Sequence, residues 1–224
     1  MMLPYRIAML CVFIPFVTVH TTLTIGVSVG NLALCNPYWA DCHSISATGR
    51  QYPEFFVFKA LLIPAAVFMV AYWLLLYQWI QKVTEHTRKP SVVLGMGLVA
   101  SIALIVYTVT LGAEGEPYSL ARRIGVVFYF AFTAFAHLIL LSHLDKIDTH
   151  KLGIVAQQNR LAISAIALIV TAIASAAMGY FFDDFWDRWE NAYEWWFSLL
   201  MTSMFYHVGI MWRKTRYTVS LFIS

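Results

Sequence analysis

Three histidines and one glutamate stand where proton transfer within a membrane protein would need them. His20, His137 and His207 interrupt long apolar stretches, and Glu194 stands at the beginning of another. A histidine held by a carboxylate acts as a general base near neutral pH, which is the chemistry that hydroxyl activation or acyl transfer requires. We therefore predict that these four residues are the candidate catalytic groups.

A long polar loop supplies groups that can bind a substrate. It begins at Cys35 and runs to the next apolar segment, and loops of this length in compact proteins usually carry function. Its candidate substrate-binding residues are Ser44, Ser46, Thr48 and Glu54. The sequence predicts a site at the outer face of a membrane, in which His20 and Glu194 face these loop residues.

The cysteines and the known short motifs bear on redox and cofactor chemistry. Cys35 and Cys42 share the polar loop, and if that loop faces an oxidising space they either form a disulfide or remain two free thiols. No HExxH or CxxC motif, nucleophile elbow, phosphate-binding glycine loop or dinucleotide fingerprint occurs. We expect no metal and no cofactor. Because the basic residues are dispersed over several turns, we also expect no nucleic-acid partner.

The elements that must position these groups are apolar helices. Of the 224 residues, 60% are hydrophobic and 12% are charged, whereas soluble domains are about half apolar and about a quarter charged. A bilayer core of about 30 Å needs roughly 20 apolar residues per helix. We therefore predict an all-α, polytopic membrane protein in which residues 1–224 form one domain. Its six transmembrane helices cover about residues 5–29, 55–80, 92–111, 124–142, 161–181 and 195–212.

The distribution of Lys and Arg predicts the orientation of these helices. Ten of the 15 lie on the side that holds the N-terminus, Arg88 and Lys89 among them, and five lie on the other side. By the positive-inside rule both termini are cytoplasmic and the polar loop is a long first extracytoplasmic loop. A helical rise of about 1.5 Å per residue then puts His20 in the outer half of the membrane and His137 and His207 in the inner half.

Each candidate also has a purely structural interpretation. A histidine in an apolar helix can be a hydrogen-bonded packing residue, and Glu194 can be an exposed carboxylate near the positive N-terminal end of a helix. The acidic, aromatic turn 181–196 is typical of an interfacial aromatic belt, and the alternative is that it floors a headgroup site. Close helix packing is expected on the third helix, where the small residues are Gly95, Gly97, Ala100 and Ser101.

Several stretches resemble a known family, the DRAM and Cwh-type membrane proteins. The residues similar to its first luminal loop and second helix are the run SISATGRQYPEFFVFK (residues 44–59), then Pro64, Ala71, Tyr72 and Trp73. Those similar to its fourth and final helices are Phe128, Phe130, His137 and Leu138, then Glu194, Trp195, Met204, Phe205, His207 and Trp212. Within the family, the likeness is greatest to the post-GPI-attachment factors, which act in GPI-anchor lipid remodelling.

The resemblance implies a six-helix core and a role in remodelling or recognising lipid, with an acyltransferase-like activity as one possibility. In eukaryotes that role is the reacylation of GPI anchors in the Golgi. In a bacterium the substrate would be an envelope phospholipid or a lipoprotein anchor. The chain departs from the family at Ala47, where many members have an aspartate, and at Arg122 and Arg123, where many have a histidine. These departures concern the catalytic mechanism more than the fold.

We expect a protein that binds a membrane lipid under residues 44–54 and takes part in changing its acyl chains. In this hypothesis Glu194 and His20 are the acid–base pair, Arg122 or Arg123 contacts phosphate, and His137 and His207 form a second, deeper pair. The alternative is a non-catalytic scaffold that stabilises a membrane-protein partner. A channel or transporter has less support, because no helix offers a polar stripe. The expected location is the Golgi or ER membrane in a eukaryote and the inner membrane in a bacterium.

Overall fold

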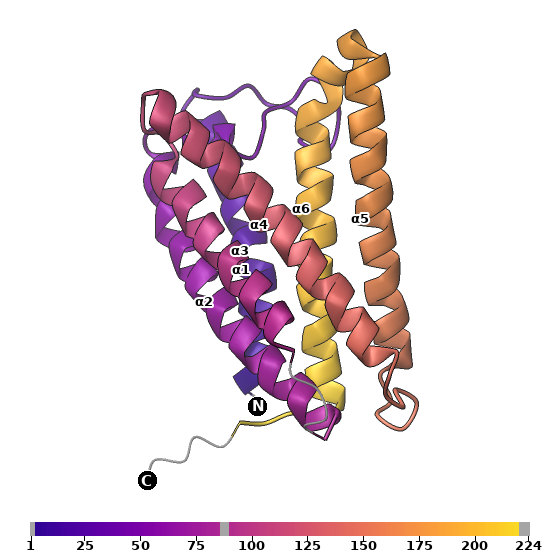
Figure 1. Cartoon of the computed structure of the whole chain (residues 1–224). Helices are drawn as coiled ribbons and strands as arrows, with labels where there is room; N and C mark the ends of the chain where they lie inside the picture. The colour runs from indigo at the N-terminus through magenta and orange to yellow at the C-terminus, as the bar shows by residue number, and fades with distance from the viewer. Residues whose placement is uncertain (1–2, 86–89, 220–224) are drawn as a thin grey trace.

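The computed structural model describes residues 3–85 and 90–219, and the regular structure in this part of the chain is entirely helical (Figure 1). The predicted all-α fold class is therefore confirmed. Arg88 and Lys89 of the charge count lie outside the described residues. The elements are α1 (Leu3–Ser28), the short 3-10 helix η1 (Ala47–Gly49), α2 (Glu54–Val83), α3 (Ser91–Thr110), α4 (Glu116–Leu144), α5 (Val155–Phe181) and α6 (Asp183–Lys214).

Five of these helices, α1 to α5, are long and apolar enough to cross a membrane. They indicate an integral, multi-pass membrane protein. The helix α6 has 32 residues but is not among the five. Its apolar part, residues 195–212, contains three tryptophans, a tyrosine and a histidine, whose polar ring atoms lower its hydropathy.

Two helices begin well before the predicted apolar windows. The helix α4 begins at Glu116 instead of residue 124, so Arg122 and Arg123 lie on a helix and not in a turn. The helix α6 begins at Asp183 instead of residue 195, so most of the acidic, aromatic stretch is helical as well. The windows marked only the apolar part of each helix, whereas backbone hydrogen bonding continues through polar residues.

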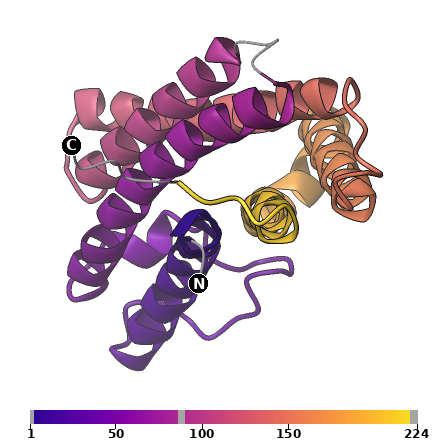
Figure 2. The same ribbon diagram turned by 90° about the horizontal axis from the view of Figure 1, so that it is seen from below.

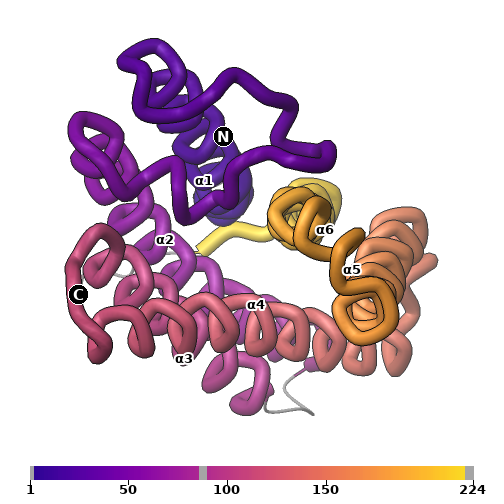
Figure 3. The backbone as a smooth tube through the Cα atoms, turned by 90° about the horizontal axis from the view of Figure 1, so that it is seen from above, coloured from indigo at the N-terminus to yellow at the C-terminus, as the bar shows by residue number. Residues whose placement is uncertain are grey.

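The six helices run alternately up and down, so that α1 begins and α6 ends at the same end of the bundle (Figure 1). The other end, here called the loop end, carries the first loop, residues 29–53. Seen from below and from above, α2, α3 and α4 lie on one side and α1 and α6 on the other, with α5 beside α6 (Figures 2 and 3). The α5–α6 hairpin projects beyond the other helices at the loop end (Figure 1).

A cluster of aromatic side chains joins α2 to α6 in the bundle core. Tyr72 and Trp73 of α2 and Phe205 and Trp212 of α6 are at most 1% exposed. The ring centroids of Tyr72 lie 4.7 Å from Phe205 and 5.1 Å from Trp212, which is the spacing of favourable aromatic pairs. This cluster fixes α2 against α6 on the side away from the loop end.

The small residues of α3 allow that helix to approach α2, as predicted, except at one position. A Cβ atom on Gly97 would collide with the indole of Trp73, and Ala100 and Ser101 are also buried. Gly95 is exposed, and a Cβ atom there would meet nothing within 4 Å. The prediction was therefore wrong for Gly95, because the twist of the helix turns that residue away from α2.

The substitution Gly97→Ala should lower the thermal stability of the detergent-solubilised protein. Overpacking of a filled interface typically costs about 1–3 kcal/mol, and the indole of Trp73, which the added methyl group would meet, is buried. Gly95→Ala is the matched control and should melt at or slightly above the wild-type temperature, because alanine has the higher helix propensity. Melting is monitored by intrinsic tryptophan fluorescence. Equal melting temperatures for the two variants would contradict this packing of α3.

Candidate functional site

A cavity of about 400 Å³ opens inside the bundle near its loop end. Its lining comes from α1, α2, α3, α4, α6 and the first loop, and α5 contributes none of the lining residues. The polar side chains of the wall share hydrogen-bonding or charged groups. They are Ser46, Arg50, Tyr107, Ser119, Arg122, Arg123, Tyr129, Glu194, Ser198 and Thr202, and the charged ones among them are the three arginines and Glu194.

The remainder of the wall is largely apolar and lies deeper in the bundle. On α4 the lining residues Val126 and Phe130 follow the two arginines by one and two turns. At about 1.5 Å of rise per residue, the wall changes from cationic to apolar within about 10 Å. Leu62 of α2, Leu104 of α3 and Val19 of α1 also belong to the apolar part. The cavity is thus amphipathic along its length.

The polar end of the cavity adjoins the surface of the bundle. A shallow depression next to it is lined by the turn between α3 and α4, residues 112–115. The depression and the cavity share Arg50, Ser119 and Arg122. These three side chains therefore stand at the mouth of the cavity, between its interior and the loop end.

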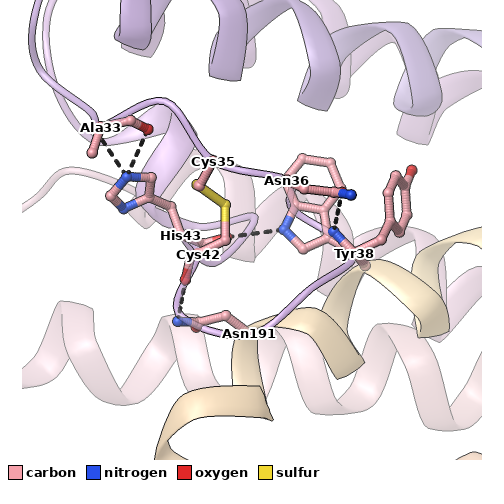
Figure 4. Close-up of a disulfide and its surroundings, with 8 residues drawn as sticks. Ala33, Cys35, Asn36, Tyr38, Cys42, His43 and Asn191 are labelled. Carbon is pink, nitrogen blue, oxygen red and sulfur yellow. Dashed lines mark hydrogen bonds between the residues drawn. A yellow bond between two sulfur atoms is a disulfide. The ribbon is translucent and has the colours of Figure 1, made fainter.

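The first loop is held over the cavity by α6. Cys35 and Cys42 form a disulfide, so of the two alternatives the disulfide is confirmed (Figure 4). Asn191 Nδ2 donates a hydrogen bond to the Cys42 carbonyl (2.8 Å), and Trp195 Nε1 donates to the His43 carbonyl (3.0 Å). Two residues after His43, the backbone N–H of Ile45 donates to Glu194 Oε2 (3.0 Å). Three neighbouring residues of α6 therefore fix the backbone of residues 42–45.

An ion pair at the tip of the loop adds a second attachment to α6. Arg188 Nη2 lies 2.7 Å from Asp41 Oδ2, and the backbone N–H of Asp41 donates to the Arg188 carbonyl (2.7 Å). The hydrogen bonds from Arg188 hold the pKa of the Asp41 carboxyl below its ordinary value. Both side chains are exposed, so the pair directs the loop without contributing much to global stability.

The loop serines shape the turn that carries Arg50. Ser44 Oγ accepts a hydrogen bond from the backbone N–H of Ala47 (3.1 Å) and lies 3.1 Å from Ser46 Oγ. Arg50 Nη2 donates to Ser46 Oγ (2.7 Å). Ser46 and Arg50 line the cavity and are hydrogen-bonded to each other. Ser44 does not line the cavity but contacts Ser46 and the backbone of Ala47.

Thr48 and Glu54 lie outside the cavity wall and attach the loop to the bundle. Thr48 is fully buried, with its hydroxyl 2.9 Å from that of Thr22 on α1. Glu54 is 1% exposed, and Asn31 Nδ2 donates to both of its carboxylate oxygens (2.9 and 3.1 Å). Their geometry accounts for a structural role in holding the loop.

The structure does not join His20 to Glu194 by a hydrogen bond. The two ring nitrogens of His20 already have partners, the Phe16 carbonyl at 2.7 Å and the Tyr38 hydroxyl at 2.8 Å. The imidazole packs edge-on against Trp195, the residue that follows Glu194. His20 therefore supports the loop and α6 beside the cavity and does not line it.

The two deeper histidines, His137 and His207, also have hydrogen-bond partners, and each contacts a different neighbouring helix. His137 is fully buried, with Nε2 3.0 Å from the Tyr72 hydroxyl and Nδ1 2.8 Å from the Thr133 carbonyl. His207 Nδ1 lies 3.2 Å from Gln157 Oε1 on α5. The two histidines thus join α4 to α2 and α6 to α5, instead of forming the expected pair with each other.

The arginines of α4 differ in what they contact. Arg122 Nη1 donates to the carbonyls of Thr110 (2.9 Å) and Ala113 (2.7 Å), so it satisfies the C-terminal end of α3 while lining the cavity. Arg123 lines the cavity with no hydrogen bond in the described part of the chain. Arg50 was not among the predicted site residues, although an arginine four residues after Ser46, in a loop otherwise poor in cations, was a usable signal.

Comparisons with protein-family models, curated proteins and solved structures find no match for this chain. The site is therefore defined by its own chemistry. Within residues 3–85 and 90–219, no three His, Cys, Asp or Glu side chains are grouped so that they could hold a metal ion. The cavity instead combines three guanidinium groups, hydroxyls and one carboxylate with an apolar interior, an arrangement suited to an amphipathic anion.

The Asp41–Arg188 ion pair predicts a titration that NMR can follow. The Asp41 carboxyl should titrate below its ordinary pKa of 3.8, and Arg188→Gln should return it toward that value. Because the folded-state pKa is lowered, the contribution of the pair to loop docking is present above pH 3.8 and is lost as the pH falls through the folded-state pKa. An unchanged Asp41 titration in Arg188→Gln would show that the pair does not form in solution.

Proposed function

We propose that this chain is a membrane-embedded protein that recognises a lipid and takes part in remodelling its acyl chains. The observation that carries the proposal is the amphipathic cavity, in which Arg50 and Arg122 stand at the mouth, Arg123 lines the wall beside them, and Leu62 and Leu104 line the interior. A lipid has the same division, with a polar headgroup at one end and an acyl chain at the other. The cavity supplies a matching environment for each part.

The volume of the cavity is sufficient for part of a lipid molecule. Ligand sites in proteins generally range from about 300 to about 1,000 Å³, and this one has about 400 Å³. It has room for a headgroup fragment and part of one acyl chain, while the remainder of the lipid stays in the bilayer. In the proposal, the lipid enters the cavity from the membrane with its headgroup and part of one acyl chain.

The proposed membrane arrangement has six spanning helices, with α6 crossing at residues 195–212. Both termini are cytoplasmic, and the first loop is extracytoplasmic. The Lys and Arg distribution supports this orientation, and a disulfide in the first loop fits an oxidising compartment. The mouth of the cavity then faces the headgroups of the outer leaflet. The compartment would be the Golgi or ER in a eukaryote and the inner membrane in a bacterium.

The resemblance of residues 44–59 and of Glu194 to the DRAM and Cwh-type family supports the same function, since residues of that run and Glu194 contribute to the cavity wall. Glu194 is the only carboxylate in that wall and is half-buried. A carboxylate in this position can accept the proton of a lipid hydroxyl as the hydroxyl oxygen bonds to the carbonyl carbon of an acyl ester. The old acyl–oxygen bond then breaks, and Glu194 returns the proton to the alcohol oxygen that leaves. In the proposal Glu194 takes this role without a histidine, and His20 keeps the adjacent Trp195 in place.

Filling the cavity should exclude lipid. We expect Val126→Trp to reduce the lipid that co-purifies with the protein to less than about half of the wild-type amount, because close-packed walls leave no room for both an indole and an acyl chain. Val127→Trp is the matched control, since the neighbouring Val127 is 59% exposed and points away from the cavity. Native mass spectrometry of both variants measures the bound lipid. Equal lipid content would argue against the cavity as the binding site.

Remodelling should depend on Glu194. We expect deletion of the gene to change the acyl composition of one membrane lipid or lipid anchor, and Glu194→Gln to fail to restore it, because loss of an acid–base group slows reactions by about 10²-fold or more. Glutamine keeps an oxygen to accept the Ile45 N–H bond, so the loop should stay in place. Glu190→Gln, one turn away on an exposed site, is the control. Mass spectrometry of total lipids gives the readout, and full rescue by Glu194→Gln would remove Glu194 from the chemistry.

A non-catalytic scaffold is the second candidate function, and one observation favours it. The projecting tip of the α5–α6 hairpin exposes Tyr180, Phe181, Phe182 and Phe185, which are 46–82% exposed. Exposed aromatic side chains beside acidic residues are suited to a membrane-protein partner. An unchanged lipid profile in the deletion strain would support the scaffold over the remodelling protein.

A further inference from the structure

We propose that the headgroup bound at the mouth of the cavity is a phosphate monoester, as in a phosphatidic-acid-type lipid, and not a phosphodiester or zwitterionic headgroup. The inference rests on the proposed lipid-binding function and names the class of lipid. It follows from the charges that line the cavity, from the hydrogen bonds that these charged groups already make, and from the number of acceptor oxygens that they can still bind.

The charged groups of the cavity wall do not balance. Arg50, Arg122 and Arg123 are permanently protonated, and Glu194 is the single carboxylate, which leaves a net charge of +2. Glu114 borders only the outer depression. None of the three arginines forms an ion pair within the described residues, where the recorded pairs are Asp41–Arg188 and Asp148–Lys151.

Uncompensated cations beside apolar walls favour the binding of an anion. Arg50 and Arg123 are exposed and Arg122 is half-buried, so an anion can reach the cluster from its outer side. Its attraction to the guanidinium groups increases toward the apolar part of the wall, where water screens the charges less. Guanidinium groups suit phosphate in particular, since their planar N–H donors bind two oxygens at once. The cluster is therefore an anion site whose geometry matches phosphate.

Two of the arginines are held in place before any ligand binds. One terminal nitrogen of Arg122 is used by the carbonyls of Thr110 and Ala113, and one of Arg50 by Ser46. Each guanidinium has five N–H donors, so both retain donors for a ligand. Because these hydrogen bonds already restrain the two side chains, binding costs less side-chain entropy than it would with arginines that have no such bonds. Arg123 has all of its donors available in the described structure.

The charge of +2 distinguishes between classes of phosphate. A phosphate monoester carries about −1.5 to −2 near pH 7 and has three terminal oxygens as acceptors. It balances the cluster and can offer one oxygen to each arginine. A phosphodiester carries one negative charge and two such oxygens, and a zwitterionic headgroup adds a cation that the arginines would repel. The apolar interior selects the lipid form of the monoester over free phosphate.

Short-chain lipids test this directly on the full chain in detergent micelles. The affinities of dioctanoyl phosphatidic acid, phosphatidylglycerol and phosphatidylcholine are measured by microscale thermophoresis. We expect phosphatidic acid to bind about tenfold or more tightly than the other two, as an additional charge-assisted contact to guanidinium implies. Arg123→Gln should remove most of this preference. Arg213→Gln, the same change in the last turn of α6 and away from the loop end, should retain the preference for phosphatidic acid.

The possible outcomes separate this inference from the function on which it rests. If phosphatidylglycerol binds as tightly as phosphatidic acid, the monoester inference is overturned and the lipid-binding function stands. If none of the three lipids binds to the wild-type protein, both are overturned. Inorganic phosphate and glycerol 3-phosphate are added as competitors. If either displaces the lipid at concentrations similar to the lipid itself, the ligand is a soluble phosphate and the lipid assignment is wrong. A preference that survives Arg123→Gln would also contradict the proposal.

Discussion

The attachment of the first loop to α6 is the interaction on which the candidate site depends. Glu194 accepts the backbone N–H of Ile45, and the neighbouring Asn191 and Trp195 bind the carbonyls of Cys42 and His43. A loop of this length has considerable conformational entropy to lose, and three hydrogen bonds from one rigid helix restrict it to a single path. That path carries the following turn, with Ser46 and Arg50, to the mouth of the cavity. Without this attachment the cavity would lose one of its walls and one of its three cations.

Several side chains of the cavity wall make a hydrogen bond within the protein and still have polar atoms that can bind a ligand. Glu194 holds the loop through one oxygen, Arg122 satisfies the carbonyl end of α3, and Ser46 binds Arg50. Such bonds hold the side chains in their positions, which is a condition for selective binding, because ordering flexible groups on binding would reduce the affinity. The same bonds explain why the site lies where the loop, α4 and α6 meet, and not on any one helix.

The histidines show how buried polar groups in a helical bundle are satisfied. His20, His137 and His207 each hydrogen-bond to a backbone carbonyl or a side chain of a neighbouring element. An unpaired polar group in an apolar interior would cost several kcal/mol in a membrane, so a histidine in a spanning helix requires such a partner whether or not it has a chemical role. The partners found here connect helices, and they leave the cavity to the arginines and Glu194.

The sequence by itself determined the helical class, five of the apolar helices and the chemistry available in the first loop. Hydropathy is a local property, so windows of about 20 residues can be recognised without any knowledge of packing. The sequence also indicated Ser46, Arg122, Arg123 and Glu194 as candidate site residues, and all four line the cavity. Only the tertiary structure decided that α4 and α6 begin earlier, which partners the histidines bind, and that Arg50 joins the site. These outcomes depend on contacts between residues far apart in the chain, such as Ile45 and Glu194, 149 positions apart, and no local pattern encodes such pairs.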